Sequence, residues 1–211
     1  MRIVIDLQYF PCLAYFCSLL QARECVIDIF EHYEKQSYRN RCNILMANKI
    51  QTLSVPIRHQ GGKKPFKDVK IDYHENWVNV HWRSIKAAYG KAPFFEFYAD
   101  DFQEALYKKP AFLADLNIAI LTACLKYLGI QKPIQYSEKY VEMQYWAEYK
   151  DIRSQIHPKK TQLIQEFYSP KPYQQVFGSK FEANLSILDL LFCEGNNSLA
   201  ILFDSSTNKV D

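Results

Sequence analysis

Two arginines flank an amide side chain in the segment YRNR, residues 38–41. Because side chains alternate along a strand, Arg39 and Arg41 share a face, with Asn40 opposite, if the strand that follows has begun by then. Two guanidinium groups on one face suit bidentate binding of a phosphate or a carboxylate. The alternative is structural, with the arginines paired to acidic residues near the end of the sheet, which are Asp28, Glu31 and Glu34.

Polar side chains also follow two short apolar segments that have the composition of buried strands. Gln8 and Tyr9 come after the first segment, and Glu31 and His32 come after the second. In open α/β sheets ligands bind beside the carboxyl ends of the strands, and a helix N-terminus there favours anions. We therefore expect these residues and the YRNR segment to meet at one sheet edge. Gln8 would share an anion pocket with both arginines, Tyr9 would help to orient the ligand, and His32 or Glu31 would transfer a proton.

Further positions have both a functional and a structural interpretation. Asn184 is a candidate ligand-binding amide. Ser186 and Asp189 stand at the spacing of a capping box, in which each side chain satisfies a backbone N–H group at a helix start, so we assign both to capping. His81 lies on an apolar helix face, which favours a core histidine with one hydrogen bond over a catalytic base.

The N-terminal third predicts most of the strands. Residues 2–6 and 25–30 are strand-like, and residues 12–22 have helical spacing between them, which predicts a right-handed βαβ unit with parallel strands. Residues 42–57 alternate around a turn and predict a hairpin. A further short strand is expected at residues 68–73.

Helical periodicity dominates the rest of the chain. Apolar stripes predict helices over residues 78–89 and 113–128, the second closed by Gly129. Residues 148–160 predict a shorter helix ended by its proline, and residues 184–195 predict a strongly apolar helix.

The fold class expected is therefore α/β, with an N-terminal sheet that contains the βαβ unit and a hairpin, followed by a largely helical C-terminal half. We expect a single domain over residues 1–211, with 1–73 mainly sheet with one crossover helix and 74–211 mainly helical.

Bulk composition excludes some classes of function. The 211 residues are 48% hydrophobic and 23% charged, and the net charge is +3, which gives no support to a protein that coats nucleic acid. No segment is long and apolar enough to span a membrane. The N-terminus resembles a signal peptide, but Asp6, Gln8 and Pro11 interrupt its apolar part and no cleavage site follows. We therefore expect a cytoplasmic protein.

The cysteines and histidines do not predict a metal site. Six cysteines occur without a CxxC pair, and the histidines lack zinc-ligand spacing. Each cysteine lies among apolar neighbours, which predicts buried free thiols in a reducing compartment.

Five segments in a fixed order carry a resemblance to a known family. They are LQYFPCLAYF, YRNRCNIL, VHWRSIKAAYGKAPFFEFY, LADLNIAIL with CLKYLGI, and FEANLSILDLLFCEG. Together they resemble the WbqC-like family of bacterial proteins, from residue 3 to about residue 203. The resemblance implies an association with surface-polysaccharide (O-antigen-type) biosynthesis. Longer members carry a Gly-rich segment before the last motif, where this chain has only TQLIQEFYS.

Two hypotheses for the function follow. The first is a protein that binds a small anionic or nucleotide-linked ligand at the sheet edge. The ligand would be a phosphorylated or nucleotide-activated molecule, and the protein would act on it as a transferase. The alternative is a non-catalytic binding or assembly protein of the same pathway, with WVNVHW and PFFEFY partly exposed as a partner surface. The sequence assigns no cofactor and no oligomeric state, and no motif indicates a nucleic-acid partner.

Overall fold

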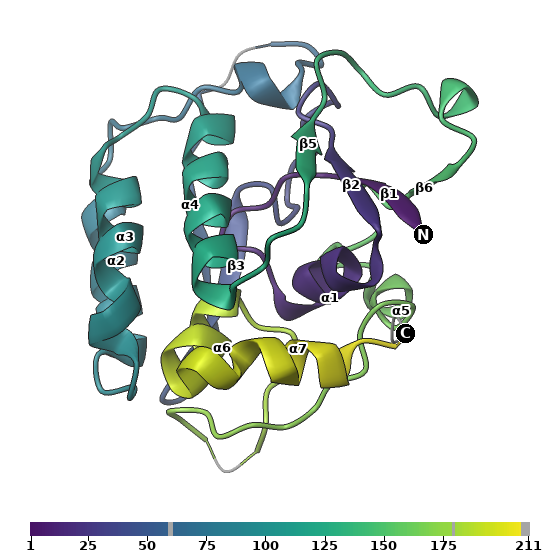
Figure 1. Cartoon of the computed structure of the whole chain (residues 1–211). Coiled ribbons are helices and arrows are strands. Elements are labelled where there is room, and N and C mark those ends of the chain that lie inside the picture. Colours follow the sequence, from purple (N-terminus) through teal and green to yellow (C-terminus); the bar gives the residue numbers. More distant parts are fainter. Residues whose placement is uncertain (59–60, 179, 208–211) are drawn as a thin grey trace.

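A four-stranded parallel sheet in the order β5-β2-β1-β6 holds the N-terminus of the chain (Figure 1). In the computed structural model, which describes residues 1–58, 61–178 and 180–207, β1 (Arg2–Ile5) and β2 (Glu24–Ile27) pair in parallel through the crossover helix α1 (Leu13–Gln21). The three residues after Arg2 are fully buried, as expected for a short β-branched strand between neighbours on both sides. The predicted βαβ unit is confirmed.

The other two strands of the sheet come from the second half of the chain. β5 (Ile134–Tyr136) pairs with β2, and β6 (Tyr149–Asp151) pairs with β1. The prediction of a helix over residues 148–160 is therefore wrong, and the short helix α5 (Thr161–Ile164) begins only after it. The segment is polar and gives no local strand signal. Pairing with β1 decides its conformation, and the N–H group of Ile152 extends it by donating to Val4 O at 2.9 Å.

A hairpin forms a second, two-stranded sheet, separate from the parallel one. β3 (Arg41–Met46) and β4 (Lys49–Ser54) pair antiparallel around a two-residue turn, as the alternation predicted. The strand expected at residues 68–73 is not formed. A 3-10 helix, η1 (Phe66–Asp68), occupies its start, and the rest forms isolated bridges, of Lys70 with Phe112 and of Ile71 with Ile57, in place of a strand.

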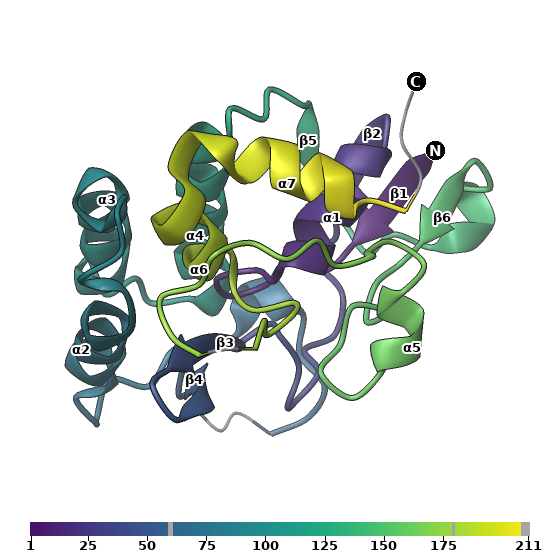
Figure 2. The same ribbon diagram turned by 90° about the horizontal axis from the view of Figure 1, so that it is seen from below.

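Helices make up most of the C-terminal half. α2 (Trp77–Tyr89), α3 (Phe95–Tyr107) and α4 (Leu113–Leu128) lie together on the side away from the N-terminus, and α6 (Ile187–Glu194) and α7 (Ser198–Ser205) run from them toward α1 (Figures 1 and 2). Two more 3-10 turns, η2 (Met143–Tyr145) and η3 (Gly195–Asn197), complete the described elements. The α/β class with a largely helical C-terminal half is thus as predicted.

One hydrophobic core links the sheet to the helices. All nine residues of α1 are buried, and the helix packs against α7. The core continues through Phe102 of α3 to Phe192 of α6, whose rings meet edge to face. Within the described parts of the chain, no helix has the length and apolar character to cross a membrane. The division into a single domain stays a prediction.

Candidate functional site

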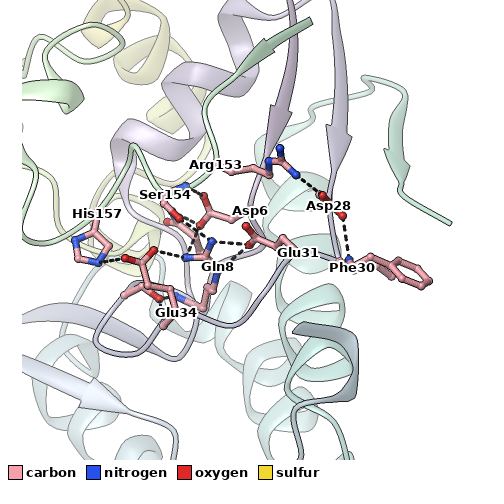
Figure 3. A network of polar contacts seen from close by, with 12 residues as sticks. Asp6, Gln8, Asp28, Phe30, Glu31, Glu34, Arg153, Ser154 and His157 are labelled. Atoms are coloured by element: carbon pink, nitrogen blue, oxygen red, sulfur yellow. Dashed lines mark hydrogen bonds and ion pairs between the residues drawn. The ribbon is translucent and has the colours of Figure 1, made fainter. Parts of the chain in front are cut away.

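Polar side chains gather where the parallel strands end (Figure 3). Asp6 follows β1, Asp28 follows β2, and Arg153 and Ser154 follow β6. The chain leaves β1 toward β2, whereas β6 lies on the other side of β1, so the sheet has a topological switch point between β1 and β6. Ligands of open α/β sheets bind at such a point.

The side chain of Arg39 fills this position. Arg39 is 1% exposed, its Nε donates to Glu31 Oε1 at 2.7 Å, and its Nη2 donates to Ser154 Oγ at 2.9 Å. The guanidinium also lies 3.9 Å from Asp6 and 3.4 Å from Glu34. Arg39 therefore holds four segments of this chain together, which is the structural alternative considered for it.

The network holds more buried carboxylate than a single arginine can neutralise. Burial, together with the nearby Asp6 carboxylate, raises the pKa of Glu31 to about 8, although Arg39 opposes the shift. Burial lowers the pKa of Arg39, but Asp6 and Glu31 outweigh it and raise that pKa overall. Glu31 could hold a proton near neutral pH, and its nearest partner is Arg39. His32, the other proposed proton-transfer residue, is exposed and stacks on Tyr140.

Gln8 and Tyr9 face the interior of the protein. Gln8 is fully buried, and its Nε2 donates to Ile156 O at 3.1 Å and to Asp6 at 3.3 Å. Tyr9 is also fully buried and shares a 2.9 Å hydrogen bond with Nδ1 of His81. Burial lowers the pKa of His81 to about 4, so the ring is neutral, as expected of a core histidine.

The side chain of Asn184 caps the N-terminus of α1. Its Oδ1 accepts the N–H of Ala14 at 2.9 Å, which satisfies a backbone donor of the first turn of that helix. Ser186 caps α6 as predicted, with Oγ accepting the N–H of Leu188. The assignment of Asp189 to the same capping box is wrong, because its buried carboxylate accepts from Tyr173 Oη at 2.6 Å instead.

Arg41 has a different environment from Arg39, because it lies at the wall of a pocket of about 580 Å³. The pocket is assembled from the segment before β3, the loop after β4 and one residue after η1. Its described lining contains five cationic side chains and no carboxylate, the cations being Lys35, Arg41, Arg58, Lys63 and Lys64. We call this set of residues and their cavity the basic pocket.

The lining residues of the basic pocket differ in exposure. Val69 is buried, and Tyr33 and Ile57 are half-buried, so the more buried part of the lining has an apolar side; the buried Asn40 and the half-buried Arg41 and Lys64 lie in the same part. Lys35 and Arg58 are exposed and stand at the rim. The ring of Tyr33 packs beside that of Phe66, to which it is nearly parallel at 14° with the ring centroids 6.5 Å apart.

Two buried polar atoms of the pocket residues lack a hydrogen-bond partner in the part of the chain that the structure describes. They are Oδ1 of Asn40 and Nε of Arg41. The other end of the Asn40 amide is fixed, since Nδ2 donates to Val55 O at 2.9 Å. His59 and Gln60, between Arg58 and the glycines of the pocket, lie outside the described residues.

Five of the expected site residues fall into two groups, whereas Tyr9, His32 and Asn184 belong to neither. Arg41 and Asn40 line the basic pocket, whereas Arg39, Gln8 and Glu31 form the network at the strand ends. The expectation that both arginines share one pocket with Gln8 is not met, because β3 begins only at Arg41 and Arg39 precedes the alternation.

Sequence reasoning missed most of the cations of the pocket. The run RHQGGKKPF, residues 58–66, was a visible signal, because it joins glycines with three basic residues. That run alone predicts only a polar loop. Its position beside Arg41 follows from the fold, through the hydrogen bond from the N–H of Tyr33 to Lys64 O at 3.1 Å.

Comparisons with known proteins agree with the motifs. The model of the WbqC-like protein family matches residues 8–165, which include the described residues of the basic pocket. The chain is also similar to the uncharacterized protein Rv1507c of Mycobacterium tuberculosis, with 27% identity over 218 residues that cover 91% of this chain and 93% of that protein. No solved structure matches the chain. The family match extends over well more than half of the residues, and so the chain belongs to the WbqC-like protein family.

Proposed function

We propose that this chain binds a phosphorylated small molecule in the basic pocket. The observation that carries the proposal is the lining of five cations without a carboxylate among the described residues. Cations placed together repel one another, and an anionic ligand relieves that repulsion while accepting their hydrogen bonds. The guanidinium of Arg41 contributes a planar fork that suits a phosphate group.

Similarity to the WbqC-like family supports a role in bacterial surface-polysaccharide biosynthesis. The phosphorylated molecule would then be a nucleotide-activated sugar or a related intermediate, and the chemistry would be group transfer. A cytoplasmic setting is part of the proposal, because six free cysteines suit a reducing compartment.

A non-catalytic binding or assembly protein of the same pathway is the second candidate. One observation favours it: Phe97, within PFFEFY at the start of α3, is 73% exposed, and Val80 on α2 is 55% exposed. Most of the neighbouring aromatic residues, such as Trp77 and Phe95, are buried in the core instead. The partner surface of this candidate would therefore be small.

The test is calorimetric titration with UDP-glucose and with glucose 1-phosphate, using wild-type protein and two arginine variants. We expect Arg41→Ala to weaken binding about 10- to 100-fold, because it removes charged hydrogen bonds to the ligand. We expect it to change the free energy of unfolding by less than about 1 kcal/mol, because the half-buried side chain of Arg41 lines the pocket and its Nε has no hydrogen-bond partner in the described chain.

The matched control is Arg83→Ala, which removes an exposed arginine of α2 outside the pocket lining. Binding by this variant should equal that of the wild type. An Arg41→Ala protein that binds either ligand as well as the wild type does, or a wild type that binds no phosphorylated compound, would contradict the proposal.

A further inference from the structure

We infer that the ligand of the basic pocket is a nucleoside diphosphate, free or as the head of a larger molecule, with its base against Tyr33 and its phosphates at the cationic rim. The inference rests on the proposed function and narrows its ligand class. It follows from the aromatic and apolar side chains in the lining and from the exposed cations of the same pocket.

The more buried part of the lining offers an apolar side. Tyr33, Ile57 and Val69 lie there, and the stacking of Tyr33 on Phe66 fixes the plane of the phenol ring. The backbone of Tyr33 is fixed as well, because its N–H donates to Lys64 O. A rigid aromatic ring is the usual platform for a nucleobase, which stacks on it with little loss of conformational entropy. A small sugar phosphate has no comparable flat face.

The rim offers charge and open backbone. Lys35, Arg58 and Lys63 are exposed there, and the two adjacent glycines bring no side chain between the cations and a ligand. A Cβ atom added at Gly61 or Gly62 would meet nothing within 4 Å, so the space beside the backbone is open. Gly62 has a φ of +79°, a conformation that other residues rarely adopt. Several cations around an open space can bind two linked phosphate groups at the same time.

The experiment is a calorimetric series on the wild-type protein with ADP, UDP, ribose 5-phosphate and inorganic pyrophosphate. We expect at least one nucleoside diphosphate to bind about tenfold or more tightly than either compound that lacks a base, since stacking of a base strengthens binding by that order. Ribose 5-phosphate or pyrophosphate binding as tightly as ADP and UDP would overturn the inference and leave the proposed function standing. Failure of all four to bind would overturn the inference, and failure of UDP-glucose and glucose 1-phosphate as well would overturn both.

Two variants of Tyr33 locate the base. Tyr33→Leu should weaken binding of the preferred nucleoside diphosphate about tenfold or more and leave pyrophosphate binding unchanged, whereas Tyr33→Phe, which keeps the ring, should retain most of the affinity. Arg58→Ala tests the position of the phosphates, and it should weaken the binding of nucleoside diphosphates and of pyrophosphate by similar factors. Equal losses for both ligands on Tyr33→Leu, with the melting temperature maintained, would overturn the placement of the base.

Discussion

At the scale of single residues, burial rather than residue type separates the two arginines of YRNR. Arg39 is surrounded by Glu31, Asp6 and Ser154, and removing it would leave buried carboxylates without a cation. Truncating one member of such a pair costs on the order of 3–5 kcal/mol of stability. Arg41, two positions later, borders open space instead, so the same chemical group is available to a ligand.

The network at the strand ends should make stability depend on pH through Glu31. Its pKa in the folded protein is raised from the ordinary 4.5 to about 8, chiefly by burial. The folded state therefore binds more protons than the unfolded state between these values, so this contribution to stability is complete below about pH 4.5 and is lost as the pH rises toward 8. We expect a loss on the order of 4–5 kcal/mol from this group between these pH values, measured by urea unfolding at several pH values.

Glu31→Gln is the informative variant, because a neutral glutamine can still accept a hydrogen bond from Arg39. Its stability should vary less between pH 5 and pH 8 than that of the wild type. Glu75→Gln, which changes an exposed carboxylate outside the network, should follow the wild-type curve. Identical pH profiles for Glu31→Gln and the wild type would show that Glu31 is ionised throughout this range.

At the scale of elements, the end of α4 depends on a single backbone conformation. Gly129 has a φ of 67°, and its N–H donates to the last carbonyl groups of the helix. Space is not the constraint there, since a Cβ atom would meet nothing within 4 Å. The cost of another residue is therefore conformational.

We expect Gly129→Ala to lower the free energy of unfolding by about 1–2 kcal/mol, because an L-residue is disfavoured in this region. Gly129→Asn should lose less, because asparagine tolerates the left-handed conformation. Thermal unfolding should accordingly rank the proteins as wild type, Gly129→Asn and Gly129→Ala. An alanine variant as stable as the wild type would mean that the helix can end in another way.

At the scale of the whole molecule, the fold buries most of the cysteines and leaves all six unpaired. Five are buried, and Cys193 is half-buried. All six are free, as the sequence predicted. Burial raises the pKa of the Cys12, Cys17 and Cys25 thiols to about 12, so little reactive thiolate is present at neutral pH.

We expect a thiol reagent to modify the native protein slowly, with Cys193 reacting before the others. In denaturant without reductant the same reagent should titrate six thiols, because the pKa values return to their ordinary range. Fewer than six thiols in denaturant would indicate a disulfide and would contradict the reducing compartment that the proposal includes. Rapid reaction of several thiols in the native state would show that the core opens readily.

The sequence by itself determined the elements whose signals are local. The βαβ unit, the hairpin, the helices α2 and α4 and the serine cap at Ser186 depend on residues within one segment, where period and capping chemistry act directly. The helix α3 was not predicted. The arginines, the amide of Asn40 and the polar residues after the strands were also visible as candidates. Their chemistry is a property of the side chains themselves.

Only the tertiary structure decided where those side chains are used. The polar segment Tyr149–Asp151 is a strand because it pairs with the edge of β1. Asp189, one helical turn after Ser186, accepts a hydrogen bond from Tyr173 and does not cap the helix. Arg39 became a structural cation because Asp6, Glu31 and Ser154 meet at the switch point of the sheet, and their separation in sequence hides that meeting. The basic pocket arises in the same way, from a polar loop that packs beside Arg41. A local pattern limits the conformation of its own segment, whereas ion pairing and burial depend on which distant segments fold against it.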